Sequence, residues 1–139
     1  MKVTMLGCGY VGLVSGTCFA EFGASVICYD VDKTKIEKLR RSELPIYEPG
    51  LEKLLKKNIQ EGRLIFTDNL NNCVPNSDLV FIAVGTPTRR GDGHADLSYV
   101  YQAAKDLAPL LSGYTVIVDK STVPVGTARN VKHLILENN

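Results

Sequence analysis

The stretch GCGYVG, residues 7–12, places three glycines directly after an apolar run. Glycine lowers stability inside regular structure, so three at fixed spacing indicate that something approaches the backbone closely. The spacing G-x-G-x-x-G binds the pyrophosphate of a dinucleotide when it joins a strand to a helix. In that role Gly7 makes the tight turn, Gly9 leaves room for the pyrophosphate, and Gly12 lets the helix pack on the sheet. The helix start adds unpaired N–H groups and the positive end of a dipole.

An acidic residue, Asp30, ends the next apolar run, at about the distance of 20 residues that this fingerprint has. Its carboxylate can accept hydrogen bonds from the adenosine ribose and repel a 2′-phosphate, which favours NAD over NADP. Lys33 and Lys35 lie close enough in the chain to weaken that discrimination. The alternative is a glycine turn in a fold that binds no nucleotide, which the matched context disfavours.

Two further clusters, VGTP at residues 84–87 and KSTVPVGT at residues 120–127, each follow an apolar run. In open α/β sheets, ligands bind outside the carboxyl ends of the strands. Both clusters are therefore expected on the same edge as the glycine loop, where their hydroxyls could hydrogen-bond a ligand. Turn chemistry alone would account for the same residues equally well.

The elements that must position these residues alternate between strands and helices along the chain. Apolar runs and helical spacing predict the elements, while glycine, proline and aspartate mark their ends. Strands are expected at residues 2–6, 25–29, 64–67, 78–84 and 115–118. Helices are expected after the first, fourth and fifth of these strands. Two more are expected between the second and the third, a short one over residues 32–41 and another from about residue 49 to residue 62. The boundary residues expected to start, cap, kink or stop helices are Gly23, Asp32, Pro49, Gly62, Asp96 and Pro109.

This alternation predicts an α/β fold of the Rossmann type, a doubly wound parallel sheet with helices on both faces. The continuous apolar run at residues 78–84 is typical of a strand that is buried on both sides. The 139 residues form one expected domain, and the chain ends in the helix that follows the fifth strand.

Composition excludes several classes of partner. The net charge is +1, so bulk charge favours neither nucleic acid nor an anionic membrane. No apolar run reaches the ~18 residues of a membrane span, and the N-terminal run is too short for a signal peptide, so we expect a cytoplasmic protein. Basic residues at 33–41 alternate with acidic ones and indicate a solvated helix face. The four cysteines lack metal-ligand spacing, and Cys18 and Cys28 are expected to be buried, reduced thiols.

Five motifs taken together resemble the UDP-glucose/GDP-mannose dehydrogenase family. They are GCGYVGL, YEPGLEKLL, VGTP, DLSYV and KSTVPVGT, in order through the whole chain. The last two are more similar to the UDP-glucose 6-dehydrogenase branch than to the GDP-mannose branch. The resemblance implies oxidation of UDP-glucose to UDP-glucuronate with reduction of two NAD. An aldehyde forms first, and a cysteine thiolate then attacks it to give a thioester that is hydrolysed.

The resemblance also implies roles for individual residues. Tyr10 and Val11 would contact the pyrophosphate, Asp30 and Lys35 would hold the adenosine ribose, and Thr122 would belong to the catalytic pocket. The implied cofactor-binding set is Gly7, Gly9, Tyr10, Val11, Gly12, Asp30, Lys35, Thr86, Pro87 and Thr122.

Members of that family continue with a further strand that carries glutamates, a long central helix and a sugar-nucleotide domain that carries the nucleophilic cysteine. Residues 1–139 are therefore expected to be the NAD-binding domain of a larger, homodimeric enzyme, inactive alone. The dimer would form through the missing central region. Two alternatives stay open: the cofactor domain of a GDP-mannose 6-dehydrogenase, or a regulatory module that senses NAD(H).

Overall fold

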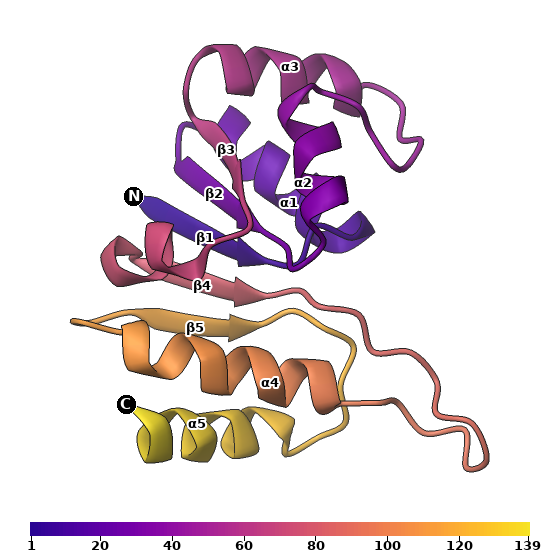
Figure 1. The fold of residues 1–139 in the computed structure, drawn as a ribbon, viewed down its shortest axis with the longest axis vertical. Helices are drawn as coiled ribbons and strands as arrows, with labels where there is room; N and C mark the ends of the chain where they lie inside the picture. The colour runs from indigo at the N-terminus through magenta and orange to yellow at the C-terminus, as the bar shows by residue number, and fades with distance from the viewer.

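Five short strands form one parallel sheet in the computed structural model, which describes residues 1–139. Their order across the sheet is β3-β2-β1-β4-β5, and every neighbouring pair is parallel (Figure 1). This arrangement confirms the predicted doubly wound fold. The strands are β1 (Lys2–Leu6), β2 (Ser25–Tyr29), β3 (Leu64–Thr67), β4 (Leu79–Ile82) and β5 (Val116–Asp119).

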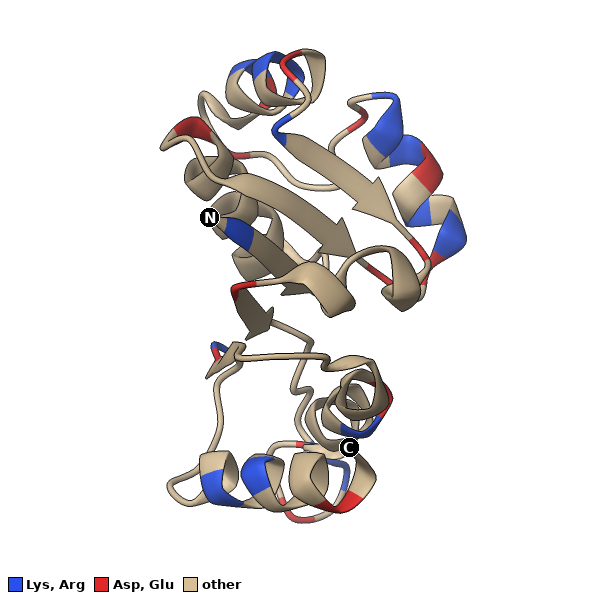
Figure 2. Cartoon of the chain, turned by 90° about the vertical axis from the view of Figure 1, so that its left-hand side faces the viewer, with Lys and Arg blue, Asp and Glu red and all other residues tan.

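Five α-helices connect and follow the strands, together with three short 3-10 helices. None is long and apolar enough to cross a membrane. The α-helices are α1 (Tyr10–Glu21), α2 (Lys33–Arg40), α3 (Leu51–Gln60), α4 (Ser98–Leu107) and α5 (Thr127–Asn138). The 3-10 helices are η1 (Leu70–Asn72), η2 (Val74–Asn76) and η3 (Ala108–Leu110). Charged residues lie mainly on the helices and loops, whereas the strands carry few of them (Figure 2).

The sheet separates two apolar cores, because successive side chains of a strand point to opposite faces. Val3 and Met5 of β1 lie in the core beneath α1, α2 and α3, whereas Leu6 lies in the core beneath α4 and α5. The order of elements in Figure 1 shows the same division, with α4 and α5 beside β4 and β5. Burial on both faces explains why the strands are apolar runs rather than alternating ones.

Four of the expected helix boundaries are confirmed. Gly23 and Gly62 have φ of 98° and 70° directly after α1 and α3, a backbone conformation that suits glycine. Asp32 caps α2, since its carboxylate accepts the N–H of Lys35 at 3.1 Å. The α4 helix ends just before Pro109, and the 3-10 helix η3 replaces its last turn.

Two of the expected helix boundaries are wrong by one or two residues. Pro49 does not lie in the first turn of α3, because Gly50 caps that helix in a left-handed conformation with φ of 83°. Asp96 is not the cap of α4, whose cap is Leu97; its carboxylate instead accepts the N–H of Ser98 in a local turn. The strand expected at residues 78–84 is shorter, with β4 ending at Ile82.

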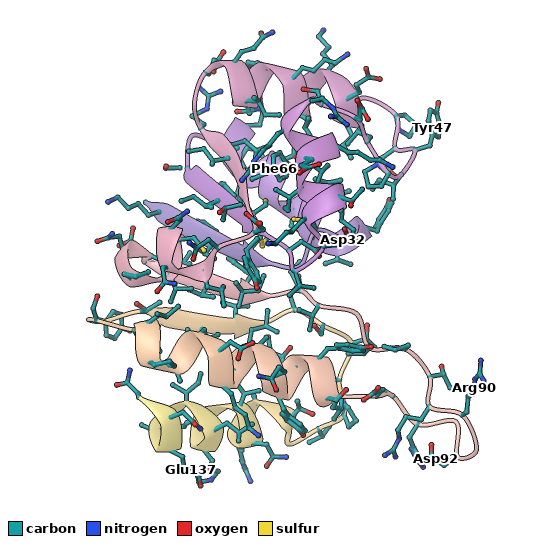
Figure 3. All side chains as sticks on the ribbon, viewed as in Figure 1. Asp32, Tyr47, Phe66, Arg90, Asp92 and Glu137 are labelled. Carbon is teal, nitrogen blue, oxygen red and sulfur yellow. The ribbon has the colours of Figure 1, made fainter.

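The segment between β4 and α4, residues 83–97, contains a loop that projects from the body of the molecule (Figure 1). Its two arms pair at one bridge, Thr88 with Ala95, and Figure 3 labels Arg90 and Asp92 near its tip. All four cysteines are free, and the prediction of a buried thiol is confirmed for Cys28, while Cys18 is half-buried.

Candidate dinucleotide-binding site

Gly7 and Gly12 are glycines for structural reasons. Gly7 leaves β1 with φ of 106°, and a Cβ on it would lie 2.6 Å from the carbonyl oxygen of Ala83. A Cβ on Gly12 would lie 1.9 Å from the carbonyl oxygen of Gly7. The turn and the first turn of α1 therefore touch through backbone atoms alone, which is the close packing expected of these two positions.

Gly9 is different, because neither its backbone nor its surroundings require glycine. It caps α1 with an ordinary φ of −74°, and a Cβ built on it would meet nothing within 4 Å. No side chain caps α1, and the N–H groups of its first turn have no intrahelical acceptor. The space in front of Gly9 is thus open, and the backbone donors behind it face that space.

Asp30 joins the glycine loop to β2 and α2. Only 9% of the residue is exposed. Its Oδ2 accepts the backbone N–H of Cys8 at 2.9 Å and the ammonium group of Lys35 at 3.2 Å. Its Oδ1 accepts the backbone N–H of Asp32 at 3.0 Å. An ionised carboxylate has about four acceptor positions, so one position on Oδ1 stays available to a ligand hydroxyl.

The two loops at the ends of β4 and β5 are linked by side-chain hydroxyls. Thr86 donates to the carbonyl oxygen of Thr122 at 3.1 Å, and Ser121 donates to that of Val84 at 2.8 Å. The clusters VGTP and KSTVPVGT therefore meet at the carboxyl edge of the sheet, as predicted. These bonds use hydroxyl protons of Thr86 and Ser121 to hold the loops together.

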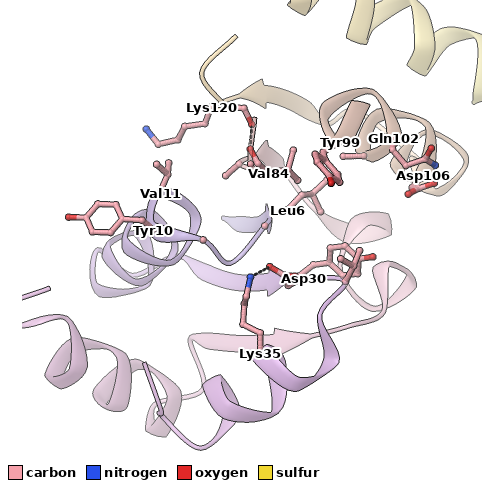
Figure 4. Close-up of a pocket in the computed structure, with 18 of the residues that line it drawn as sticks. Leu6, Tyr10, Val11, Asp30, Lys35, Val84, Tyr99, Gln102, Asp106 and Lys120 are labelled. Atoms are coloured by element: carbon pink, nitrogen blue, oxygen red, sulfur yellow. Dashed lines mark hydrogen bonds and ion pairs between the residues drawn. The ribbon is translucent and has the colours of Figure 1, made fainter. Parts of the chain in front are cut away.

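A cavity of about 560 Å³ runs along this edge from the glycine loop to α4 (Figure 4). That volume is ordinary for a small-molecule site. The cavity is lined by these members of the predicted set: Gly7, Gly9, Tyr10, Val11, Asp30, Lys35 and Thr122. Gly12, Thr86 and Pro87 do not line it. Gly12 lies at the contact between α1 and the turn, and Thr86 and Pro87 lie in the segment that follows β4.

The residues of α4 that form one wall of the cavity were not predicted from the sequence. Tyr99, Gln102, Ala103 and Asp106 all line the cavity. Their spacing is helical, so they form one stripe of α4, next to the apolar stripe that enters the core. The sequence shows that such a stripe exists, but only the packing of the helix decides that it faces a cavity.

Neither the thiol of Cys8, in the glycine loop, nor the hydroxyl of Tyr29 is poised as a nucleophile. A hydrogen bond with Cys28 and burial raise the pKa of the Cys8 thiol well above its ordinary range. Burial, with the charges of Asp106 and Asp30, raises the pKa of Tyr29. Both groups therefore stay protonated at neutral pH. The site can bind and orient a ligand, and these side chains add no covalent chemistry.

Comparison with known proteins identifies the family of this chain. All of residues 1–139 match the model of the UDP-glucose/GDP-mannose dehydrogenase family, NAD binding domain. The chain belongs to this family. It is 60% identical over its full length to UDP-glucose 6-dehydrogenase of Rhizobium meliloti (strain 1021). It is 52% identical over 134 residues to UDP-glucose 6-dehydrogenase TuaD of Bacillus subtilis (strain 168).

Solved structures of the family share the fold closely. GDP-mannose dehydrogenase from Pseudomonas aeruginosa superposes with a TM-score of 0.94 at 38% identity. UDP-glucose dehydrogenase from Pyrobaculum islandicum does so with 0.93 at 40% identity. Each alignment covers 99% of this chain and 32% of the other. The chain likewise spans 32% and 29% of the two sequence relatives, so it is the NAD-binding domain of the family and corresponds to about a third of their length.

NAD fits the site by two observations of the structure. The open space and free donors in front of Gly9 suit a pyrophosphate, and the remaining acceptor position of Asp30 suits a ribose hydroxyl. The carboxylate of Asp30 at the same place would repel a 2′-phosphate, and its ion pair with Lys35 would weaken that repulsion.

Proposed function

We propose that this chain is the NAD-binding domain of a UDP-glucose 6-dehydrogenase that converts UDP-glucose to UDP-glucuronate in the cytoplasm. The observation that carries the proposal is Gly9. Its glycine has no backbone or packing reason, and it stands where the fingerprint places a pyrophosphate. The identity of 60% to the Rhizobium meliloti enzyme favours UDP-glucose over GDP-mannose as the substrate of the whole protein.

In this proposal each side chain has a defined task. Bound NAD supplies the hydride acceptor. The first N–H groups of α1, at Tyr10 and Val11, donate to the pyrophosphate, while Asp30 accepts from the adenosine ribose and Lys35 holds Asp30 in place. Thr122 closes the cavity at the nicotinamide end. Thr86 acts on that end indirectly, since its hydroxyl fixes the backbone of Thr122.

The 139 residues supply the cofactor half of the reaction in this proposal. Oxidation of an alcohol to an acid needs a positioned base and a nucleophile. Cys8 is not placed as the nucleophile, because its thiol is buried with a raised pKa, and Asp30 is not placed as the base, because it already accepts from three donors. The chain mixed with NAD and UDP-glucose is therefore expected to give no NADH absorbance above the blank. The remaining groups, and the contacts that form a homodimer, belong to the other two thirds of the relatives.

Replacement of Gly9 by valine tests the pyrophosphate position. A Cβ at this position has space in the free protein, so Gly9→Val is expected to fold, with a slightly lower melting temperature because valine is a poorer helix cap than glycine. The same side chain occupies the space of the pyrophosphate, so calorimetric titration is expected to show no NAD binding. Gly113→Val is the matched control, since a Cβ there also meets nothing and the position lies outside the cavity. A folded Gly9→Val variant with undiminished affinity would overturn the assignment.

A further inference from the structure

Two polar side chains of α4 have no task in the function proposed above. Gln102 and Asp106 lie one turn apart on the stripe of α4 that lines the cavity, opposite Asp30 and Lys35 (Figure 4). The amide nitrogen of Gln102 donates to Oδ1 of Asp106 at 2.7 Å. Neither residue belongs to the motifs that carry the family resemblance.

The position of this pair relative to the cofactor rests on the proposed function. With the pyrophosphate at Gly9 and the ribose at Asp30, the base must lie farther along the cavity, on the side away from Thr122. That stretch is bounded by Val31, Leu70 and Ala103, whose apolar surfaces suit the two faces of a purine. Val31 is 79% exposed, as expected of a side chain whose contact is a ligand rather than the core.

Asp106 decides which way the amide of Gln102 points. A carboxylate can only accept hydrogen bonds, so the NH₂ group of Gln102 must face Asp106. The amide oxygen then points away from Asp106, as an acceptor with a fixed direction. Tyr29 and Tyr99 also line this stretch, but a hydroxyl both donates and accepts and cannot tell an amine from a carbonyl.

We propose that Gln102, oriented by Asp106, reads the exocyclic amino group of the cofactor's adenine. An amide that accepts from this amine and donates to a neighbouring ring nitrogen is the usual way in which glutamine recognises adenine. Hypoxanthine carries a carbonyl oxygen where adenine carries the amine, so two acceptors would face each other. Gln102 is then a specificity-determining residue, and Asp106 is a positioning residue that acts through it.

The test compares the affinities of the 139-residue chain for NAD and for nicotinamide hypoxanthine dinucleotide by calorimetric titration. This chain can be used by itself, because its sheet has an apolar core on each face. The parent chain is expected to bind NAD about three- to ten-fold more tightly, the effect of one hydrogen bond. Gln102→Leu is expected to weaken NAD binding and to bring the ratio of the two affinities close to one. Asp106→Asn is expected to narrow the ratio with a smaller loss of NAD affinity, because an amide partner accepts either orientation of Gln102.

Lys105→Gln is the matched control, since Lys105 lies on the same helix, is exposed and does not line the cavity. It is expected to keep the parent ratio. Equal binding of the two dinucleotides by the parent, or a Gln102→Leu variant that keeps the parent ratio, overturns the inference while the proposed function stands. A parent chain that binds neither dinucleotide overturns the proposed function and this inference with it.

Discussion

Asp30 and Asp119 stand at the carboxyl ends of two strands of one sheet, yet their surroundings are opposite. Asp30 follows β2, which has a strand on each side, and its carboxylate accepts hydrogen bonds from three donors. Asp119 ends β5, an edge strand, and both of its carboxylate oxygens are buried without any hydrogen-bond partner. The two carboxylates therefore differ in the number of hydrogen-bond donors that the fold provides to them.

The same contrast extends to the strands themselves. Residues of β1 and β2 alternate between the two cores, and most are buried, whereas every residue of β5 is half-buried or exposed. A second cavity of about 290 Å³ lies between β5 and α5 and is lined by Asp119 and Lys132. The glycine-loop half of the sheet is thus organised before a ligand arrives, while the β5 edge keeps an unpaired backbone and an unpaired charge.

The largest expected effect comes from the organised half. Gly12→Val places a Cβ 1.9 Å from a backbone oxygen, an overlap that no rotamer change can relieve. We expect destabilisation of about 3 kcal/mol or more in urea unfolding, because α1 must move away from the turn. NAD binding should weaken as well, because the N–H groups at the start of α1 move with the helix. An unfolding midpoint equal to that of Gly9→Val would contradict the close contact between Gly12 and Gly7.

The glycine-loop half of the sheet shows which features could be predicted from the sequence. Alternating apolar runs predict the parallel sheet, and the fingerprint predicts that Gly7, Gly9 and Asp30 share one edge. The bond from Cys8 to Asp30 was not predicted, because it depends on how the turn folds back over β2. Three-dimensional packing also decides that Gln102 and Asp106 face the cavity.

The starts of α3 and α4 were predicted wrongly, because more than one residue near each start has a type that favours a helix boundary. Pro49 is a favourable first helical residue, yet Gly50 takes a left-handed conformation and α3 begins after it. Asp96 satisfies a backbone donor, as a cap does, one residue earlier than the helix boundary. The hydroxyl bonds between the loops of Thr86 and Thr122 need two strand ends that are far apart in the sequence, so only their proximity could be expected.

A smaller effect is expected when the prepared carboxylate is removed. Asp30→Ala loses a charged acceptor for the ribose, which corresponds to about 1.5–3 kcal/mol, or roughly ten- to a hundred-fold in NAD affinity. The difference in affinity between NAD and NADP should become smaller, because the charge that repels a 2′-phosphate is gone. Asp68→Ala is the control, since Asp68 directly follows β3 and does not line the cavity. Unchanged NAD affinity in Asp30→Ala would assign the ribose to another group.

The smallest effect is expected at Asp119, and its sign is opposite. Burial raises the pKa of this carboxyl above its ordinary value of 3.8, and the nearby N–H of Ser121, which lies outside hydrogen-bond geometry, lowers it by less. The folded protein therefore holds this proton more tightly than the unfolded chain does. The resulting stabilisation is complete below pH 3.8 and is lost as the pH rises through the raised pKa.

Asp119→Asn removes the charge and keeps the shape, so the variant should be more stable than the parent at pH 7. The gain is expected to stay below about 1 kcal/mol, because the side chain is only partly buried and solvent screens its charge. Below pH 3.8 the parent carboxyl is protonated and the two proteins should unfold at the same urea concentration. Asp30→Asn is expected to lose stability at pH 7, since an amide NH₂ cannot accept from all three donors that face Asp30. A loss of stability in Asp119→Asn at pH 7 would mean that the surroundings of Asp119 stabilise its carboxylate as well as those of Asp30 do, and the contrast between the two strand ends would fail.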